Sequence, residues 1–275
     1  MHPAMKHTSI LPIMSLLVSG ALSGCLDVDE TDAAVTSEDV AVTGVDATAV
    51  RCRPSIRFQN RTADGNGRVF DEQVPNPTTF ARAAAQRVCK VLYRTASEVP
   101  RVPFIKLVIE DFDGVAWADP SAHEVHVSSL YLAGVAQRST EEELRYEITG
   151  VIDHELTHVY QHLDGPGWLI EGMADFVRLH TGFIPESNRG RGGHYDDAYQ
   201  TTAFFLDWID DAKPGFGYEV NQSMRDGDGQ EWTLDVFQQL TGTDVDTLWN
   251  QYQDSLPLRL GAAGMAVERR PCERP

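Results

Sequence analysis

The apolar positions between residues 140 and 163 recur at helical spacing and predict a long amphipathic helix. Thr140 followed by three glutamates is typical of a capping box with an acidic first turn. Gly165-Pro-Gly167 is expected to end the helix. Between these two signals, one apolar face recurs every three or four residues. It consists of Ile148, Ile152, Leu156, Val159 and Leu163.

The stretches before this helix alternate in polarity or are rich in β-branched residues, and they predict a small sheet. The expected strands are 56–58, 68–70, 102–110, 115–117 and 124–127. Pro75 and Pro77 precede a further apolar pattern at helical spacing, which predicts a helix over 78–97.

The chain after the long helix shows helical spacing of apolar residues almost throughout. Helices are expected over 168–179, 195–211, 218–224, 232–240 and 245–256. The Gly-rich segment 182–193 is expected to be a mobile, solvated loop that includes Arg189 and Arg191. Together the elements predict an α+β fold with a small mixed β-sheet and a helical C-terminal half.

The first 50 residues predict an export signal followed by a tether. Lys6 precedes an apolar run too short for a membrane span, which is typical of a signal peptide over 1–24. Leu22-Ser-Gly-Cys25 resembles the lipobox of bacterial lipoproteins, so Cys25 is expected to carry lipid; an ordinary secretory signal is the alternative. Residues 25–50 predict an acidic disordered tether, and residues 51–275 the folded domain. We therefore expect a lipid-anchored lipoprotein of the cell envelope, or a secreted protein.

Three further cysteines bear on the folded domain, because an exported protein meets oxidising conditions. Cys52 and Cys272 lie near the two ends of this domain, and the ends of a domain often lie close together. Cys89 falls within a predicted apolar helix, which favours a buried thiol. We expect a Cys52–Cys272 disulfide, with a pairing through Cys89 as the alternative.

The acidity of the chain limits its partners. The 275 residues carry a formal net charge of −18, while 42% of them are hydrophobic, which is enough for a sizeable core. Nucleic acids and anionic membrane surfaces are bound through clustered Lys and Arg. We therefore expect no nucleic-acid partner, membrane contact through the lipid anchor alone, and a monomer.

The long helix carries candidate metal chemistry in His154-Glu-Leu-Thr-His158. Two histidines four residues apart project from one face of a helix, a spacing that allows both to bind one Zn²⁺. Glu155 would then lie beside the metal, where it can act as general base toward a zinc-activated water. Ile152 and Leu156 fall nearly opposite the histidines, so one face enters the core while the other faces a cleft.

A catalytic zinc usually has three protein ligands, and Glu171 is the candidate for the third. It follows His158 by thirteen residues, after a Gly-Pro-Gly turn that can reverse the chain. Asp175 lies four residues further on the same predicted helix face, where it can accept the free N–H of a ligand histidine. This spacing of Glu and Asp behind H-E-x-x-H is that of the gluzincins, the thermolysin-like zinc peptidases.

Three segments make the chain similar to the plant basic secretory protein family, which also has bacterial relatives. They are His154-Glu-Leu-Thr-His-Val-Tyr-Gln161, the helix 169–179, and Tyr199 followed by Thr202-Ala-Phe-Phe-Leu-Asp207. The likeness covers about 52–256, although this chain is acidic rather than basic.

The resemblance implies a zincin-like fold and a gluzincin-type zinc peptidase acting on peptides or proteins, with residues 51–275 as the catalytic domain. It implies His154, His158 and Glu171 as zinc ligands, with Glu155 as the base. Tyr199 would stabilise the oxyanion, with His194 and Tyr195 as alternatives. By analogy with other zinc peptidases, a strand before the metal helix would be the sheet edge that binds an extended peptide.

Two other functions remain open from the residues alone. One is a zinc-bearing protein that binds a peptide or glycan without turnover, and the other is a metal-dependent amidase of the cell wall. Other metal candidates are weaker. His123 and His126 are expected on opposite faces of a strand, His162 is expected to face solvent or to support a ligand, and 226–231 is expected to be an acidic turn rather than a calcium loop.

Overall fold

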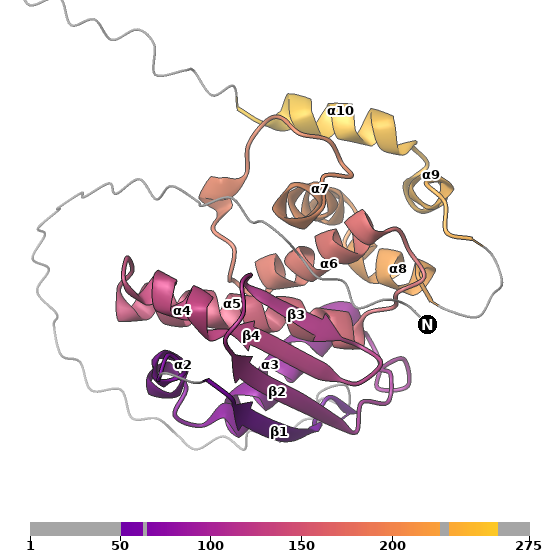
Figure 1. The fold of residues 1–275 in the computed structure, drawn as a ribbon. Helices are drawn as coiled ribbons and strands as arrows, with labels where there is room; N and C mark the ends of the chain where they lie inside the picture. The colour runs from indigo at the N-terminus through magenta and orange to yellow at the C-terminus, as the bar shows by residue number, and fades with distance from the viewer. Residues whose placement is uncertain (1–50, 63–64, 226–230, 258–275) are drawn as a thin grey trace, which may run out of the picture.

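A computed structural model describes residues 51–62, 65–225 and 231–257 (Figure 1). The predicted signal peptide, the tether, Cys25, Cys272 and most of the 226–231 turn lie outside these residues. No helix within the described ranges has both the length and the apolar character needed to cross a membrane.

A four-stranded mixed sheet forms one layer of the N-terminal half. Its strands are β1 (Ser55–Asn60), β2 (Phe104–Glu110), β3 (Ala116–Asp119) and β4 (Glu124–Ser128), in the order β1-β2-β4-β3. The first three in that order run parallel, and β3 pairs antiparallel with β4 at the edge. Side chains alternate across β2, so Ile105, Leu107 and Ile109 enter the core.

Helices cover the inner face of the sheet and make up the whole C-terminal half. Their bounds are α2 Arg68–Gln73, α3 Pro77–Leu92, α4 Ser129–Ala136, α5 Glu141–Tyr160, α6 Gly167–His180, η1 Glu186–Asn188, α7 Tyr199–Ala212, α8 Phe216–Ser223, α9 Asp235–Thr241 and α10 Val245–Ser255. The α+β class with a mixed sheet and a helical C-terminal half is thereby confirmed.

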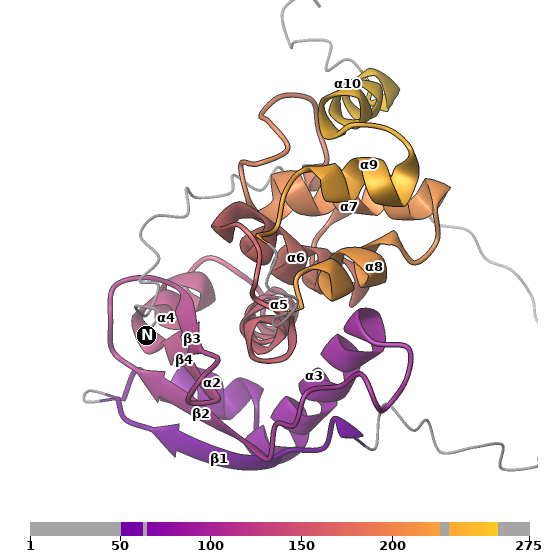
Figure 2. The same cartoon turned by 90° about the vertical axis from the view of Figure 1, so that its right-hand side faces the viewer.

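Helix α5 runs through the middle of the molecule, between the sheet with α3 on one side and helices α6 to α8 on the other (Figure 2). The predicted capping box is present, because Thr140 and Glu143 each bind the other's backbone N–H. Every residue from Ile148 to Tyr160 is buried, so this part of the helix is enclosed on all sides, while Glu141 to Glu143 are exposed. It ends at Tyr160, where Gln161 takes an extended backbone, and thus before the predicted Gly165.

Residues 68–70 were expected to form a strand and instead belong to α2. Asn60, at the end of β1, donates to the Gly67 carbonyl at 3.2 Å and to the Asp71 carboxylate at 3.0 Å, which favours a helical turn over a hairpin. Phe70 then stacks on Phe58 of β1, with ring centroids 5.6 Å apart. The partner of β1 is therefore the distant strand β2.

The sequence pattern also missed α4, because its apolar residues directly follow the apolar strand β4. Ser128 ends the strand and starts the helix, since its hydroxyl accepts from the Tyr131 N–H at 3.2 Å. The segment Ser129–Ala136 therefore leads the chain from the sheet to the start of α5.

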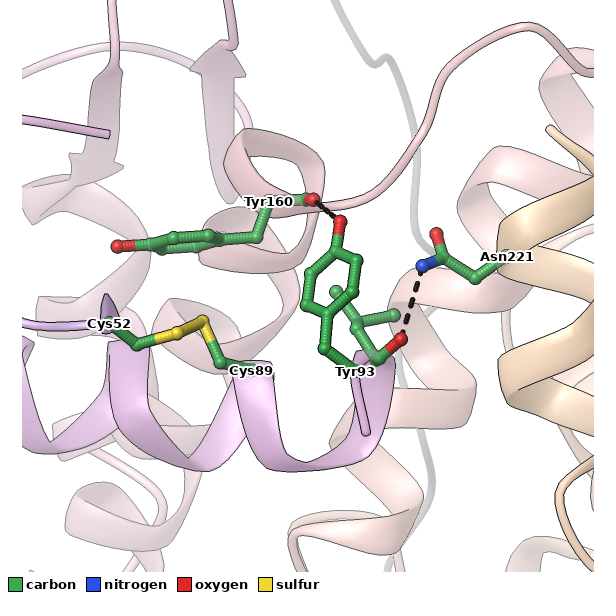
Figure 3. Close-up of a disulfide and its surroundings, with 6 residues drawn as sticks. Cys52, Cys89, Tyr93, Tyr160 and Asn221 are labelled. Carbon is green, nitrogen blue, oxygen red and sulfur yellow. Dashed lines mark hydrogen bonds between the residues drawn. A yellow bond between two sulfur atoms is a disulfide. The ribbon is translucent and has the colours of Figure 1, made fainter. Parts of the chain in front are cut away.

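The predicted Cys52–Cys272 disulfide is wrong, because Cys52 is bonded to Cys89 (Figure 3). Helix α3 packs along β1, which brings the two Cα atoms to 6.4 Å, and both residues are fully buried. The Tyr93 hydroxyl, one turn beyond Cys89, donates to the Tyr160 carbonyl at the end of α5. Asn221 of α8 donates to the Leu92 carbonyl at 3.3 Å, so the disulfide region is tied to both halves of the fold.

Candidate metal centre

Three donor groups from two helices converge in the buried centre of the molecule. His154 Nε2 and His158 Nε2 on α5 lie 3.2 Å apart. Glu171 Oε2 on α6 lies 3.3 Å from the first and 3.6 Å from the second. All three side chains are buried, and they are the one group of this kind found within the described residues.

These separations suit a single metal ion. Three donors placed about 2.1 Å from one tetrahedral ion lie about 3.4 Å from one another. The three observed separations of 3.2, 3.3 and 3.6 Å lie on either side of that value. Two imidazoles and one carboxylate are a usual donor set for catalytic zinc, which keeps its fourth position for water or substrate. The residues therefore fit the ion that the sequence predicts.

Close contacts between α5 and its neighbour α6 hold the donors in register. Gly150 of α5 allows this approach, because a Cβ atom there would lie 2.5 Å from Arg178 Nε. The Arg178 guanidinium donates to Glu147 of α5 at 2.8 Å and to the Phe183 carbonyl at 3.0 Å. This buried link fixes how α6 lies on α5, and so where Glu171 meets the histidines.

His154 is oriented by Asp175, as the sequence spacing predicts. His154 Nδ1 lies 2.7 Å from Asp175 Oδ1, and both side chains are buried. Burial alone would lower the pKa of His154, but the carboxylates of Asp175, Glu171 and Glu155 together outweigh it and raise that pKa to about 10. With Nδ1 committed to Asp175, Nε2 is the atom directed at His158 and Glu171.

His158 has a different partner, which sequence reasoning missed. Gln161 Nε2 donates to His158 Nδ1 at 2.9 Å and to the Ile170 carbonyl at 3.2 Å. Gln161 follows His158 by three residues at the end of the helix, and this H-x-x-Q spacing was the available signal. The two histidines are thus supported by a carboxylate and by an amide, respectively.

Glu155 and Tyr199 lie close to the three donors. Glu155 is 5% exposed, and its charge acts on both His154 and Tyr199. The Tyr199 ring is nearly parallel to that of His154, with centroids 6.1 Å apart. Burial raises the pKa of the Tyr199 phenol, and the carboxylates of Glu171, Asp175 and Glu155 raise it further, so the hydroxyl keeps its proton at neutral pH.

An unusual backbone brings Tyr199 to this position. Ala198 and Tyr199 have φ values of 66° and 46°, in the left-handed region that side chains other than glycine rarely adopt. Helix α7 starts there and packs closely on α6, where a Cβ on Gly172 would lie 2.2 Å from Thr202 Cγ2. The strained turn therefore sits where α7 enters the centre, a placement typical of functional residues.

The two alternatives to Tyr199 have other contacts. His194 is exposed and pairs with Asp196 at 2.5 Å. Tyr195 is buried and packs against Trp168, with centroids 5.7 Å apart, while its carbonyl accepts from Thr202. Tyr199 is thus the one of the three whose ring stacks on a candidate ligand.

The remaining sequence candidates have structural contacts away from the donors. His126 lies between Glu110 at 2.6 Å and Glu124 at 3.0 Å on the sheet, and His123 occupies the turn before β4. His162 is half-buried rather than solvent-facing, and its ring meets Tyr93 edge-on at 6.0 Å.

The expectation of solvated arginines in the 182–193 loop is wrong for Arg189, whereas Arg191 is exposed. Arg189 donates to Glu186, to Asp207 and to the Phe204 carbonyl. Arg191 donates to the Leu256 carbonyl at 2.8 Å, in the segment that follows α10. Both guanidiniums therefore bind the loop to the helical half, although Arg191 remains exposed.

Comparison with protein families gives one match. The sequence model of a family described as peptidase of plants and bacteria matches residues 53–252. The chain belongs to this family. The span includes all three candidate metal donors together with Glu155, Asp175 and Tyr199, and the match confirms the resemblance drawn from the sequence. Neither the curated proteins nor the solved structures include a significant match to the chain. Membership supports a peptidase in general terms, and the buried donor group could hold a metal ion.

Proposed function

We propose that the protein is a gluzincin-type zinc peptidase that hydrolyses peptide bonds, with His154, His158 and Glu171 as its metal ligands. The observation that carries the proposal is the separation of the three donor atoms by 3.2, 3.3 and 3.6 Å. Glu155 is buried on the same helix, and its charge acts on His154. When bound there, zinc lowers the pKa of water to roughly 7 and polarises a carbonyl.

The chain's own groups supply the proton transfers and the positioning. Glu155 accepts a proton from the attacking water and returns it to the leaving amine. Tyr199 keeps its phenolic proton at neutral pH and donates it as a hydrogen bond to the developing oxyanion. Asp175 holds the His154 ring so that Nε2 faces the metal position.

The fold offers a place for an extended substrate. Strand β3 is an edge of the sheet, and it contacts α5. An edge strand presents unpaired backbone groups to which a peptide can add as a further strand. We propose that the substrate lies along β3 with its scissile bond at the metal, as in zincin-like peptidases.

A peptide digest tests this proposal. The purified chain starting at residue 25 is incubated with a peptide library, with and without a chelator, and cleavage is read by mass spectrometry. We expect cleavage that chelation removes and added zinc restores. Binding without cleavage would favour the peptide- or glycan-binding alternative, and cleavage of peptidoglycan fragments alone would favour the amidase.

Export and anchoring rest on the sequence. We propose that the chain is cleaved before Cys25 and carries lipid there, which would place the catalytic domain on the cell envelope at the end of an acidic tether. Mass spectrometry of the N-terminal peptide from the natural host tests this, because lipid adds a defined mass to Cys25.

A further inference from the structure

The two candidate ligand histidines have different chemical supports. A carboxylate such as Asp175 can only accept a hydrogen bond, whereas an amide such as Gln161 can donate from nitrogen or accept at oxygen. The amide is therefore the one partner here that can serve a histidine ring in either of its neutral tautomers. We therefore consider which role the Gln161 amide has at His158.

The contacts of Gln161 leave one half of its amide unused. Gln161 is 5% exposed, and its nitrogen donates both to His158 Nδ1 and to the Ile170 carbonyl. Its oxygen is buried and accepts no hydrogen bond within the described part of the chain. A buried carbonyl oxygen without a hydrogen-bond donor costs about 1–3 kcal/mol of stability. The presence of such an oxygen beside His158 therefore needs an explanation.

A metal on the other ring nitrogen supplies that reason. A neutral imidazole that binds a metal through Nε2 carries its single proton on Nδ1 and donates it. A half-turn of the Gln161 amide would present the buried oxygen as the acceptor for that proton. When Nδ1 carries no proton, the amide nitrogen can donate to it, and Gln161 Nε2 lies 2.9 Å from His158 Nδ1.

We infer that Gln161 is the positioning residue of His158, holding Nδ1 through its amide nitrogen without metal and through its amide oxygen with metal. This inference rests on the proposed metal site. Gln161 also lies at the end of α5 and bonds the carbonyl of the residue before Glu171, so a purely structural link between α5 and α6 is the competing explanation.

Two substitutions of similar length separate these explanations. Gln161→Glu keeps an oxygen acceptor for His158 but cannot donate to Ile170. Gln161→Met keeps neither contact. A link to Ile170 would be lost in both variants, whereas support of His158 would be lost only in Gln161→Met. Gln253→Met is the matched control, because Gln253 is a half-buried glutamine that accepts from the Gly192 N–H at 2.8 Å, away from the metal donors.

The experiment measures metal binding rather than turnover. Metal-free proteins are titrated with Zn²⁺ against a chromophoric chelator, and the visible spectrum of each Co²⁺ derivative reports the ligand geometry. Thermal unfolding of the metal-free forms shows that each variant is folded. We expect Gln161→Met to weaken Zn²⁺ binding by roughly 10- to 100-fold and to alter the Co²⁺ spectrum. Gln161→Glu and Gln253→Met should stay close to the wild type.

Each other outcome has a distinct meaning. Equal weakening in Gln161→Glu and Gln161→Met would overturn the inference in favour of the structural link, as would unchanged binding in Gln161→Met. Failure of the wild-type protein itself to bind Zn²⁺ or Co²⁺ would remove the proposed metal site, and the role of Gln161 with it. Metal binding by the wild type without peptide cleavage would refute the proposed activity and leave the role of Gln161 standing.

Discussion

Asp153 and His154 are neighbours on α5, yet their buried ionic contacts serve different ends. Asp153 faces α3, where the Arg87 guanidinium donates hydrogen bonds to both carboxylate oxygens at 2.8 and 3.1 Å. His154 faces α6 and uses only Nδ1 for Asp175, while Nε2 stays directed at His158 and Glu171. A buried ionic contact is thus no sign of function by itself. What distinguishes the site is a second donor atom that points at other donors.

Removal of Glu171 is expected to have the largest effect on the candidate metal site. Glu171→Ala should lose the metal and reduce peptide cleavage to background, because two imidazoles alone make a poor catalytic zinc site. Elemental analysis of the purified variant measures the metal. One zinc bound per chain in Glu171→Ala would contradict the ligand assignment.

Glu155→Gln tests chemistry without disturbing the donors. The variant should keep its zinc but lose roughly 10²- to 10⁴-fold in kcat, since an amide cannot accept the proton from water. Steady-state kinetics and metal analysis on the same preparation check both halves. Full activity would exclude Glu155 as the base.

Asp175→Asn tests the outer contact of His154. Loss of the carboxylate should weaken zinc binding by roughly 10- to 100-fold, because the ring loses the partner that fixes its orientation. A competition titration with a chromophoric chelator measures the change. Arg87→Leu, on the other side of α5, serves as the control and should leave zinc affinity unchanged.

The same Arg87→Leu variant tests how much the Arg87–Asp153 ion pair contributes to stability. Removing Arg87 leaves the buried Asp153 carboxylate without its ion-pair partner, which should cost roughly 3 kcal/mol of unfolding free energy. Burial already raises the pKa of Asp153, and Arg87 opposes that rise. Urea denaturation of the metal-free protein measures the loss. A stability equal to that of the wild type would show that the Arg87–Asp153 ion pair contributes nothing to the free energy of unfolding.

A pH dependence of the stability of the metal-free protein is also expected. Asp175 and its neighbours raise the folded-state pKa of His154 from 6.5 to about 10. The protonated ring therefore adds stability that is complete below about pH 6.5 and is lost as the pH rises toward 10. The Tm of the metal-free protein should fall across this window, and Asp175→Asn should flatten the slope.

Local periodicity was sufficient to predict α5, its capping box and the ligand spacing, because each depends on residues within a few turns of one another. The return of Glu171 to the histidines was also within reach, since a short turn separates the two helices. The α+β class followed from the same local patterns.

Two of the errors involve contacts between distant segments. Nothing near Cys89 indicates that α3 packs along β1 and brings it to Cys52. The strand predicted at 68–70 is a helix because Asn60 and Phe58 contact it from β1. Gln161 was missed for a different reason: its role depends on where α5 ends, and the sequence pattern placed that end several residues too late.

The Cys52–Cys89 bond bears on how the enzyme is made and assayed. It spans 37 residues of sequence, and a crosslink of that span restricts the unfolded chain by about 4 kcal/mol on an entropic estimate. A recombinant chain left in a reducing cytosol would lack this restraint, so the periplasm or an oxidising strain is the better host. Dithiol reductants would have two effects. They would reduce the disulfide in any molecule that opens, and they would also chelate zinc. Inhibition by such a reagent would therefore say little about metal dependence, and a thiol-free chelator is the reagent of choice.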